Sequence, residues 1–149
     1  MVTLKRTNSK NPDFKALVKL LDADLKIRDG DDHDFYAQFN SIDKLPFVVL
    51  AFSKNIPIGC GAIKAYNSSS MEIKRMFVTP NERGKGTASK ILKELEKWAA
   101  EQNYTACLLE TGLRQPEAIG LYKKNGYISI PNYGQYKAIA NSVCFFKKL

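Results

Sequence analysis

The sequence of 149 residues contains one histidine, His33, and three cysteines, which leaves little material for metal or thiol chemistry. The cysteines Cys60, Cys107 and Cys144 are odd in number, widely spaced and set among apolar residues. Neither a disulfide framework nor a CxxC metal pair is therefore predicted. A catalytic cysteine needs a basic partner, and His33 stands in an acidic stretch far from all three in sequence. We expect buried thiols in a reducing cytosol and no metal.

Long apolar runs are also missing. No stretch approaches the roughly 20 residues that span a bilayer, and the first residues, Met-Val-Thr-Leu-Lys-Arg, lack the apolar core of a signal peptide. There is no internal repeat, low-complexity tract or linker. With 44% hydrophobic and 26% charged residues, residues 1–149 are expected to form a single cytoplasmic domain with no membrane partner.

Basic residues outnumber acidic ones by 23 to 15, which gives a formal net charge of +8. Such a charge can indicate nucleic-acid binding. The basic residues are spread along the chain, however, and there is no basic helix, zinc-finger spacing or aromatic RNA-binding strand. An anionic small-molecule ligand explains the charge at least as well, and no nucleic-acid partner is expected.

The hydrophobic pattern predicts a mixture of strands and helices. A first strand at residues 3–7 precedes an amphipathic helix at 11–28, with Asn11 as its cap and Pro12 at its first position. A short helix is expected around residues 35–40. The further strands are predicted at residues 47–52, 58–66, 71–78 and 105–110 with two within 128–149, and the further helices at 87–102 and 116–124. The early strands form an antiparallel meander, whereas the later strand-helix-strand crossover requires a parallel pair.

A glycine turn, Arg-Gly-Lys-Gly-Thr-Ala at residues 83–88, comes directly at the start of a predicted helix. Helix N-termini present unpaired N–H groups and partial positive charge, and glycines let the backbone approach an anion closely. Spacing excludes two nucleotide motifs. A P-loop requires glycine where the chain has Thr79 and Ser or Thr where it has Gly86, and the dinucleotide fingerprint requires glycine in place of Ser89.

Two motifs in the correct order carry a resemblance to a known family. The pattern Arg-x-x-Gly-x-Ala over residues 83–88, preceded by Phe-Val-x-Pro at 77–80, resembles the GNAT superfamily of GCN5-related N-acetyltransferases. A second block at residues 116–127 resembles the A-x-x-x-Y-x-x-x-G-[FY] segment of the same family. The resemblance implies an α/β (α+β) fold, with a mixed and mostly antiparallel sheet of about seven strands, about four flanking helices and one parallel strand pair around the acetyl-CoA site.

The resemblance also implies acetyl-CoA as co-substrate and backbone groups as its main ligands. Backbone amides of the turn would hold the diphosphate, and the strand before it would pair with the pantetheine arm and polarise the thioester carbonyl. The expected cofactor-binding residues are Met76, Phe77, Val78, Arg83, Gly84, Lys85, Gly86, Thr87, Ala88 and Tyr122. Relatives often carry an asparagine shortly before the second block, and Gln115 is the candidate substitute.

Tyr122 matches the family tyrosine that protonates the departing thiolate. A phenol with a pKa of ~10 is a reasonable donor to a thiolate with a pKa of about 8.5. The alternative is that Tyr122 is an ordinary core aromatic of its helix, but the register of the second block favours the catalytic role.

A base is needed because an ammonium acceptor must lose a proton before it attacks. Glu72 stands eleven residues before Arg83, the offset at which histone-acetylating members of the family carry their glutamate base. Alternation along the strand places Glu72 on one face with Lys74 and Met76. An ion-paired Glu72 beside a water that acts as base, and Glu110 as a second carboxylate, are the alternatives.

The resemblance also implies that the amine acceptor is selected by the first two helices and the loops of the last strands. Acidic residues at 29–34 beside an aromatic suit a cationic amine, although charge runs are usually solvated. The expected substrate-binding residues are Asp32, Asp34, Tyr36, Glu110 and Tyr133.

The expected function is acetyl transfer from acetyl-CoA to a small-molecule or peptide primary amine by direct attack in a ternary complex. The alternative is a non-catalytic acyl-CoA-binding sensor, against which the presence of both Glu72 and Tyr122 argues. An exposed last strand would allow pairing across a homodimer.

Overall fold

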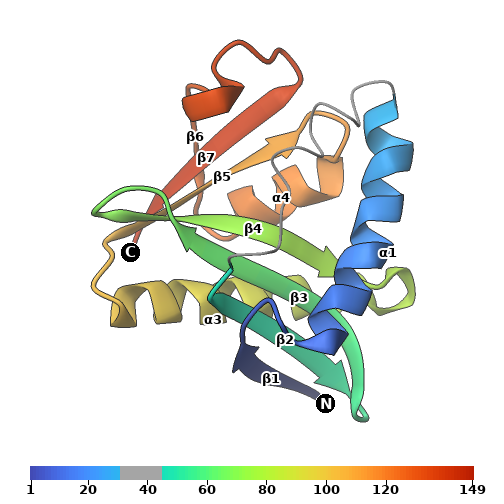
Figure 1. Cartoon of the computed structure of the whole chain (residues 1–149). Coiled ribbons are helices and arrows are strands. Elements are labelled where there is room, and N and C mark those ends of the chain that lie inside the picture. Colours follow the sequence, from blue (N-terminus) through green and yellow to red (C-terminus); the bar gives the residue numbers. More distant parts are fainter. Residues whose placement is uncertain (31–44) are drawn as a thin grey trace.

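The computed structural model describes residues 1–30 and 45–149, and its centre is a seven-stranded sheet with the order β1-β2-β3-β4-β5-β7-β6 (Figure 1). The strands are β1 (Val2–Thr7), β2 (Phe47–Ser53), β3 (Ile56–Ala65), β4 (Ser70–Val78), β5 (Ala106–Gly112), β6 (Ile128–Ile130) and β7 (Ser142–Lys148). All neighbours are antiparallel except β4 and β5, so the expected sheet is confirmed.

Three α-helices lie within the described residues, where about four were expected for the whole chain. They are α1 (Pro12–Asp29), α3 (Thr87–Glu101) and α4 (Pro116–Lys124), with short 3-10 turns η2 (Pro80–Glu82) and η3 (Gly134–Tyr136). The short helix predicted around residues 35–40 lies outside the described residues. None of the helices described is long and apolar enough to cross a membrane.

The start of α1 forms as the sequence predicts. The side chain of Asn11 accepts hydrogen bonds from the backbone N–H groups of Asp13 at 2.8 Å and Phe14 at 3.2 Å. These bonds satisfy donors that the first helical turn leaves unpaired, and Pro12 occupies the position where no N–H is needed.

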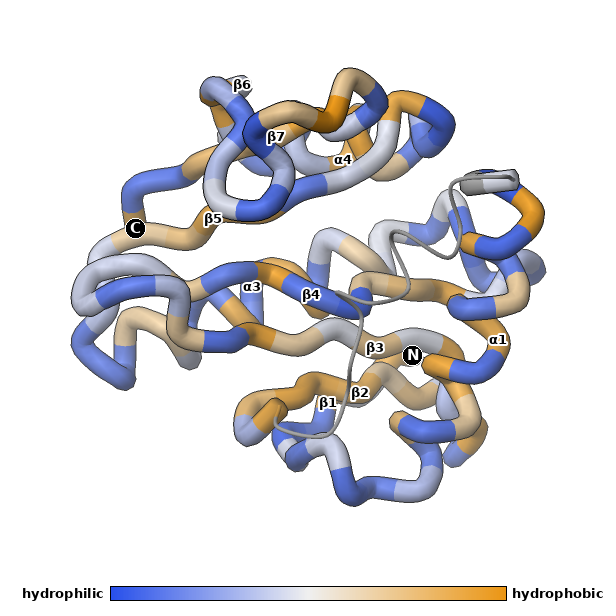
Figure 2. The backbone as a smooth tube through the Cα atoms, turned by 45° about the horizontal axis from the view of Figure 1, so that its top comes forward, coloured by the Kyte–Doolittle hydropathy of each residue, from blue (hydrophilic) through white to orange (hydrophobic). Residues whose placement is uncertain are grey.

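Two apolar clusters cover opposite faces of the sheet. In β2, Val49 and Ala51 belong to a cluster with α3 and α4, whereas Val48 and Leu50 belong to a cluster with α1. Successive side chains of a strand point to opposite faces, so α1 lies on one side and α3 and α4 lie on the other (Figure 1). The double burial explains why β2 is hydrophobic along most of its length (Figure 2).

The sheet opens in the middle of β4. The register between β3 and β4 shifts between Cys60 and Ala62, and Arg75 on the opposite strand has φ of 58°, so β4 carries a bulge. The pairing of β4 with β5 covers only residues 70–72 and 106–108. Beyond this pairing, the β5-facing edge of residues 73–78 has no strand partner in the part of the chain that the structure describes.

The bulge shows that the expected orientation of Met76 is wrong. Glu72 and Lys74 do lie together, with 3.7 Å between Lys74 Nζ and Glu72 Oε1. Met76, however, packs against the cluster of α3, and Phe77 packs against the cluster of α1. The bulge inserts one extra residue at Arg75, so every side chain after it changes face.

Contacts from two directions hold Arg75 in its unfavourable backbone conformation. Its guanidinium is ion-paired with Asp22 of α1, and its carbonyl oxygen accepts a hydrogen bond from Cys60 Sγ at 3.3 Å. The side chain is only 2% exposed. A positive φ in a residue other than glycine costs on the order of 1 kcal/mol or more, so the bulge persists because its surroundings fix it.

Gly61 faces the bulge and leaves no room for a side chain. A Cβ there would lie 2.5 Å from Met76 Sδ and 2.9 Å from Leu95 Cδ1. Gly61→Ala is therefore expected to destabilise the fold by about 1–3 kcal/mol in urea unfolding. Gly120 of α4 is the matched control, because a Cβ there meets none of the described residues within 4 Å and alanine is expected to stabilise the helix by about 0.5–1 kcal/mol. Unchanged stability of Gly61→Ala would contradict the close packing at the bulge.

The edges of the sheet differ from those expected for a dimer. The last strand, β7, is paired on both sides, with β5 and with β6. Within the described residues the free edges are β1 and β6, so the expectation of an exposed last strand is wrong.

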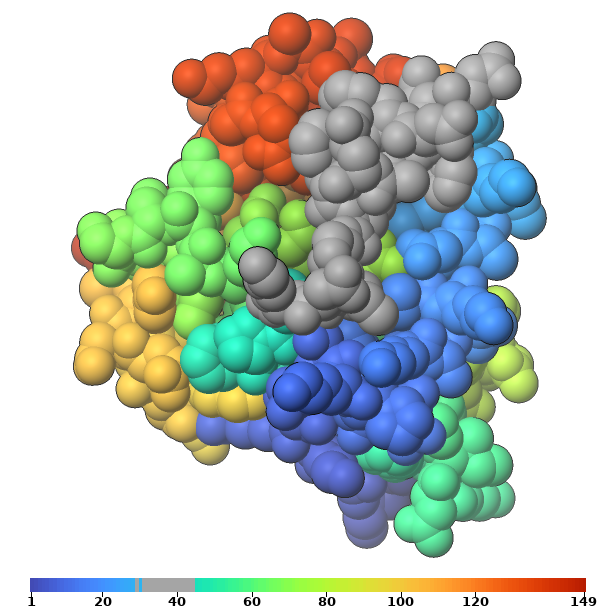
Figure 3. Space-filling view, in the orientation of Figure 1, coloured from blue at the N-terminus to red at the C-terminus, as the bar shows by residue number. Residues whose placement is uncertain are grey.

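In the space-filling view, the turn between β3 and β4 lies beside the segment between β6 and β7 (Figure 3). The rings of Tyr66 and Tyr133 meet there, with centroids 5.0 Å apart.

Candidate active site

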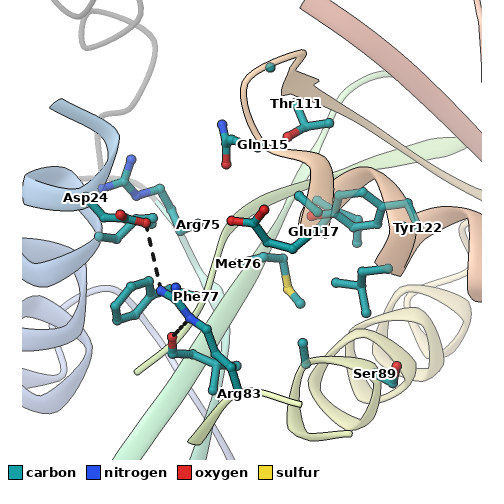
Figure 4. A pocket seen from close by; sticks show the side chains of 18 of the residues that line it. Asp24, Arg75, Met76, Phe77, Arg83, Ser89, Thr111, Gln115, Glu117 and Tyr122 are labelled. Carbon is teal, nitrogen blue, oxygen red and sulfur yellow. Dashed lines mark hydrogen bonds and ion pairs between the residues drawn. The ribbon is translucent and has the colours of Figure 1, made fainter. Parts of the chain in front are cut away.

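A cavity of about 450 Å³ occupies the opening between β4 and β5. Its walls come from α1, β4, the turn before α3, the first turn of α3, the end of β5, and α4 (Figure 4). The bulge and the short β4–β5 pairing create this space, and both sequence motifs border it. Its size suits a small-molecule ligand.

Most of the predicted site residues meet at this cavity. Those that line it are Glu72, Met76, Phe77, Val78, Arg83, Gly84, Gly86, Thr87, Ala88, Glu110, Gln115 and Tyr122. Lys85 and Tyr133 are not among the residues that line it; Lys85 is exposed and lies 3.4 Å from a carboxylate oxygen of Glu82. The predicted acceptor residues Asp32, Asp34 and Tyr36 lie outside the described residues.

The glycine turn leaves an open, electropositive space at the start of α3. Gly84 has φ of 76° and Gly86 has φ of 82°, and a Cβ at either position would meet no atom of the described residues within 4 Å. No side chain caps the first amides of α3, and Thr87 Oγ1 is buried with no hydrogen-bond partner in the part of the chain described. Uncapped amides, a helix dipole and an unpaired hydroxyl together fit a phosphate group.

Arg83 is held at the side of this space. Its Nε donates a 2.8 Å hydrogen bond to the carbonyl oxygen of Val78, and its guanidinium lies 5.5 Å from the centre of the Phe77 ring. Nη2 also lies 3.8 Å from Asp24 Oδ2 of α1 (Figure 4). The turn therefore carries a cation whose position is fixed before any ligand arrives.

The open edge of β4 supplies a second kind of binding surface. Within the described parts of the chain, residues 73–78 have no strand partner on the side of β5, so their main chain borders the cavity. Backbone groups of this kind pair readily with an extended ligand that carries amides. The cavity thus joins an anion site at α3 to an unpaired strand edge.

Tyr122 reaches the cavity from α4 and is almost fully buried. Its ring packs against Tyr127 and Phe145, with centroid distances of 5.7 and 6.1 Å. Its hydroxyl has no hydrogen-bond partner within residues 1–30 and 45–149. Burial, with the nearby charge of Glu110, raises the pKa of Tyr122, so the hydroxyl stays protonated at neutral pH. The residue is therefore a core aromatic whose protonated hydroxyl forms no hydrogen bond to the described residues.

Glu72 is buried and both of its carboxylate oxygens are engaged. Tyr133 donates a 2.6 Å hydrogen bond to Oε2, and Lys74 Nζ approaches Oε1. The ring of Tyr133 is itself held edge-on by Tyr66 and Tyr136. These contacts fix the carboxylate and favour a positioning role for Tyr133 over direct contact with an acceptor.

Glu110 lies on the same face of the sheet as Glu72. Glu72 pairs with Leu108, and Glu110 follows two residues later along β5. Tyr122 belongs to the apolar cluster on the opposite face, yet the charge of Glu110 contributes to the raised pKa of Tyr122. The cavity therefore passes between β4 and β5, with the tyrosine hydroxyl entering from one face and two carboxylates from the other.

An ion-pair network at the cavity wall was not predicted from the sequence. Arg28 of α1 pairs with Glu117 of α4, and its Nε lies 3.2 Å from Asp24 Oδ2. The spacing of Asp24 and Arg28 at i and i+4 is a readable signal for one of these pairs. The pair with Glu117 joins distant elements and has no such signal.

The cysteines offer no nucleophile. Cys60, Cys107 and Cys144 are all buried and free, as predicted. Burial raises the pKa of Cys60 and of Cys107 to about 12, so both are thiols at neutral pH. No group of three histidine, cysteine or acidic side chains in the described part of the chain could hold a metal ion.

Comparison with known protein families gives a match over most of the chain. The family model described as "Acetyltransferase (GNAT) family" matches residues 14–127. An IAA acetyltransferase of Azospirillum brasilense is 39% identical over 80 residues, which cover 53% of this chain and 52% of the relative. An uncharacterized N-acetyltransferase of Bacillus subtilis, YsnE, is 32% identical over 93 residues, which cover 61% of this chain and 62% of the relative. The aligned part is thus less than two thirds of either relative.

Solved structures match the whole chain. A Klebsiella pneumoniae protein provisionally described as an acyl-CoA N-acyltransferase has a TM-score of 0.84 and 28% identity, with 100% of this chain and 98% of that chain covered. The PaiA N-acetyltransferase of Thermoplasma acidophilum, solved in complex with coenzyme A, has a TM-score of 0.74 and 16% identity, with 100% and 99% covered. The second likeness concerns the fold alone.

Proposed function

Because the chain belongs to the acetyltransferase (GNAT) family, we propose that it transfers an acetyl group from acetyl-CoA to a primary amine. The acceptor is a small molecule or a peptide, and residues 1–149 act as one cytoplasmic domain. The observation that carries the proposal is the single cavity that connects the uncapped start of α3 to the free hydroxyl of Tyr122.

The residues at the cavity fit the parts of acetyl-CoA. The amides of residues 84–88 and the hydroxyl of Thr87 hold the diphosphate, with Arg83 beside it. The open edge of residues 76–78 pairs with the amides of the pantetheine arm. Gln115, which lines the cavity at the start of α4, supplies a further amide to this arm.

Each proposed catalytic residue moves one proton. Glu72, or a water bound to it, accepts the proton of the acceptor ammonium, and the freed amine nitrogen bonds to the carbonyl carbon of the thioester. An amide of the open β4 edge stabilises the charge that develops on the carbonyl oxygen. As the carbon–sulfur bond breaks, Tyr122 donates its proton to the departing thiolate. The second proton, which the nitrogen loses on becoming an amide, returns Tyr122 to its protonated form.

The protonation state of the cysteines supports direct attack of the amine on the thioester. An acyl-cysteine intermediate requires a thiolate nucleophile, whereas burial holds Cys60 and Cys107 as thiols and raises the pKa of Cys144 as well. Acceptor and acetyl-CoA must then be bound together. The two faces of the cavity provide a separate approach for each.

A thiol-release assay over a panel of amines tests the function. Acetyl-CoA is mixed with the protein and with amino acids, polyamines, aminoglycosides or peptides, and free thiol is followed with a chromogenic disulfide. We expect release that depends on one class of amine. Coenzyme A binding in calorimetry with no release for any amine would instead support the acyl-CoA sensor.

A further inference from the structure

Among the residues that the structure describes, one cation at the cavity differs from the others in having no acidic partner. The cations that line the cavity in the described residues are Arg28, Lys74, Arg75, Arg83 and Lys124. The first four each have an acidic partner: Arg28 pairs with Glu117, Lys74 with Glu72, Arg75 with Asp22, and Arg83 with Asp24. Lys124 forms no ion pair within residues 1–30 and 45–149. An anion can therefore bind Lys124 without breaking an existing pair.

Lys124 stands where α4 meets the start of α3. It is the last residue of α4, and the next residue, Asn125, donates a 3.1 Å hydrogen bond from Nδ2 to Oγ of Ser89. Ser89 belongs to the first turn of α3 and also lines the cavity. Arg83 is turned towards α1 instead. The anion site at the start of α3 thus lies between a fixed arginine on one side and a free lysine on the other.

Lys124 is placed for the outer part of a ligand. It is exposed, whereas Tyr122, two residues earlier on the same helix, is almost fully buried. Positions two apart on a helix point about 200° from one another. Tyr122 therefore serves the inner end of the cavity, and Lys124 serves its rim.

We propose that Lys124 binds the 3′-phosphate of coenzyme A and makes the protein select coenzyme A over its 3′-dephospho form. The proposal rests on the proposed function in so far as coenzyme A is the ligand. If the pantetheine arm runs inward from the diphosphate along β4, as proposed above, the ribose and its phosphate would lie outward, towards the rim of the cavity where Lys124 stands. A lysine ammonium is a well-suited point charge for such a phosphate.

Calorimetric titration of the full chain with coenzyme A and with 3′-dephospho-coenzyme A at one fixed ionic strength tests the proposal. We expect the wild type to bind coenzyme A about tenfold more tightly than the dephospho form. Lys124→Ala is expected to lose this preference while its affinity for the dephospho form stays unchanged. Lys124→Arg, which keeps the charge, is expected to retain most of the preference.

Lys123 provides the matched control. It is the neighbouring residue of the same helix, is also exposed, and is not among the residues that line the cavity. Lys123→Ala makes the same change in net charge and is expected to keep the full preference. If Lys123→Ala and Lys124→Ala lost the preference for coenzyme A equally, the effect would be one of net charge alone and the proposal would be overturned. A full preference for coenzyme A in Lys124→Ala would also overturn it. Wild-type protein that binds neither compound would overturn the proposed cofactor and this proposal together.

Discussion

Tyr122→Phe is expected to lower kcat for acetyl transfer by about 10²-fold or more while the Kd for acetyl-CoA changes little. The substitution removes the hydroxyl that would protonate the departing thiolate. It keeps the ring contacts with Tyr127 and Phe145 that hold α4 against the sheet, so the fold should survive. Thiol release at saturating substrates measures kcat, and calorimetry measures the Kd.

Tyr127→Phe is the control for this substitution. Tyr127 is a second buried tyrosine in the same cluster, but its hydroxyl donates a 2.8 Å hydrogen bond to Glu96 and it is not among the residues that line the cavity. Its loss is expected to cost stability, about 1–3 kcal/mol, and to leave kcat unchanged. If Tyr122→Phe also kept its kcat, Tyr122 would be a core aromatic and the acid would have to be sought elsewhere.

The pH dependence of the reaction should reflect the raised pKa of the buried Tyr122 hydroxyl. Burial and Glu110 raise the pKa of Tyr122 above its ordinary value of about 10. A raised pKa means that the protonated donor persists to higher pH and is lost only above the raised value. Any fall in rate below pH of about 10 must then come from another group and should remain in Tyr122→Phe.

Glu72→Gln is expected to lower kcat/KM by about 10²-fold at neutral pH, because the carboxylate proposed to take the proton of the acceptor is gone. The loss should shrink as the pH rises. Below the pKa of an alkylamine, ~10.4, the fraction of free amine increases about tenfold with each pH unit, and a free amine needs no base. The pH profile of kcat/KM for the variant should therefore be steeper than that of the wild type.

Two further variants separate the candidate bases. Tyr133→Phe removes the hydrogen bond to Glu72 Oε2 and, as a positioning change, should lower kcat/KM by less than Glu72→Gln does. Glu110→Gln tests the second carboxylate on the same face. A normal rate in Glu72→Gln with a large loss in Glu110→Gln would move the base to β5, and normal rates in both would favour a water chain.

The elements that the sequence predicts well are those set by local rules. The cap and proline at Asn11 and Pro12 locate α1, and the glycine turn locates the start of α3. The order of the two motifs indicates the family, and their meeting at one cavity follows from the fold. Tyr122 and Glu72 border that cavity as expected.

The features that the sequence does not predict depend on contacts between distant segments. Regular alternation assigns Met76 to the wrong face of the sheet, because no local sequence signal predicts a bulge at Arg75. The conformation of Arg75 depends on its contact with Asp22, 53 residues earlier. Tyr133 meets Glu72 across 61 residues. Lys124 is one of 23 basic residues, and only the shape of the cavity distinguishes it from its neighbour.

The short pairing of β4 with β5 has a thermodynamic consequence. Only three residue pairs join the two parts of the sheet along this line, so the native fold is left with a strand edge that pairs with no other strand in the described chain. A cofactor that bonds to this edge adds to the sheet itself, and its binding free energy becomes folding free energy. At a concentration of 100 times its Kd this amounts to about 2.7 kcal/mol. The stability of the protein is then set in part by the supply of cofactor, so a shortage of cofactor would reduce the amount of folded enzyme as well as its rate.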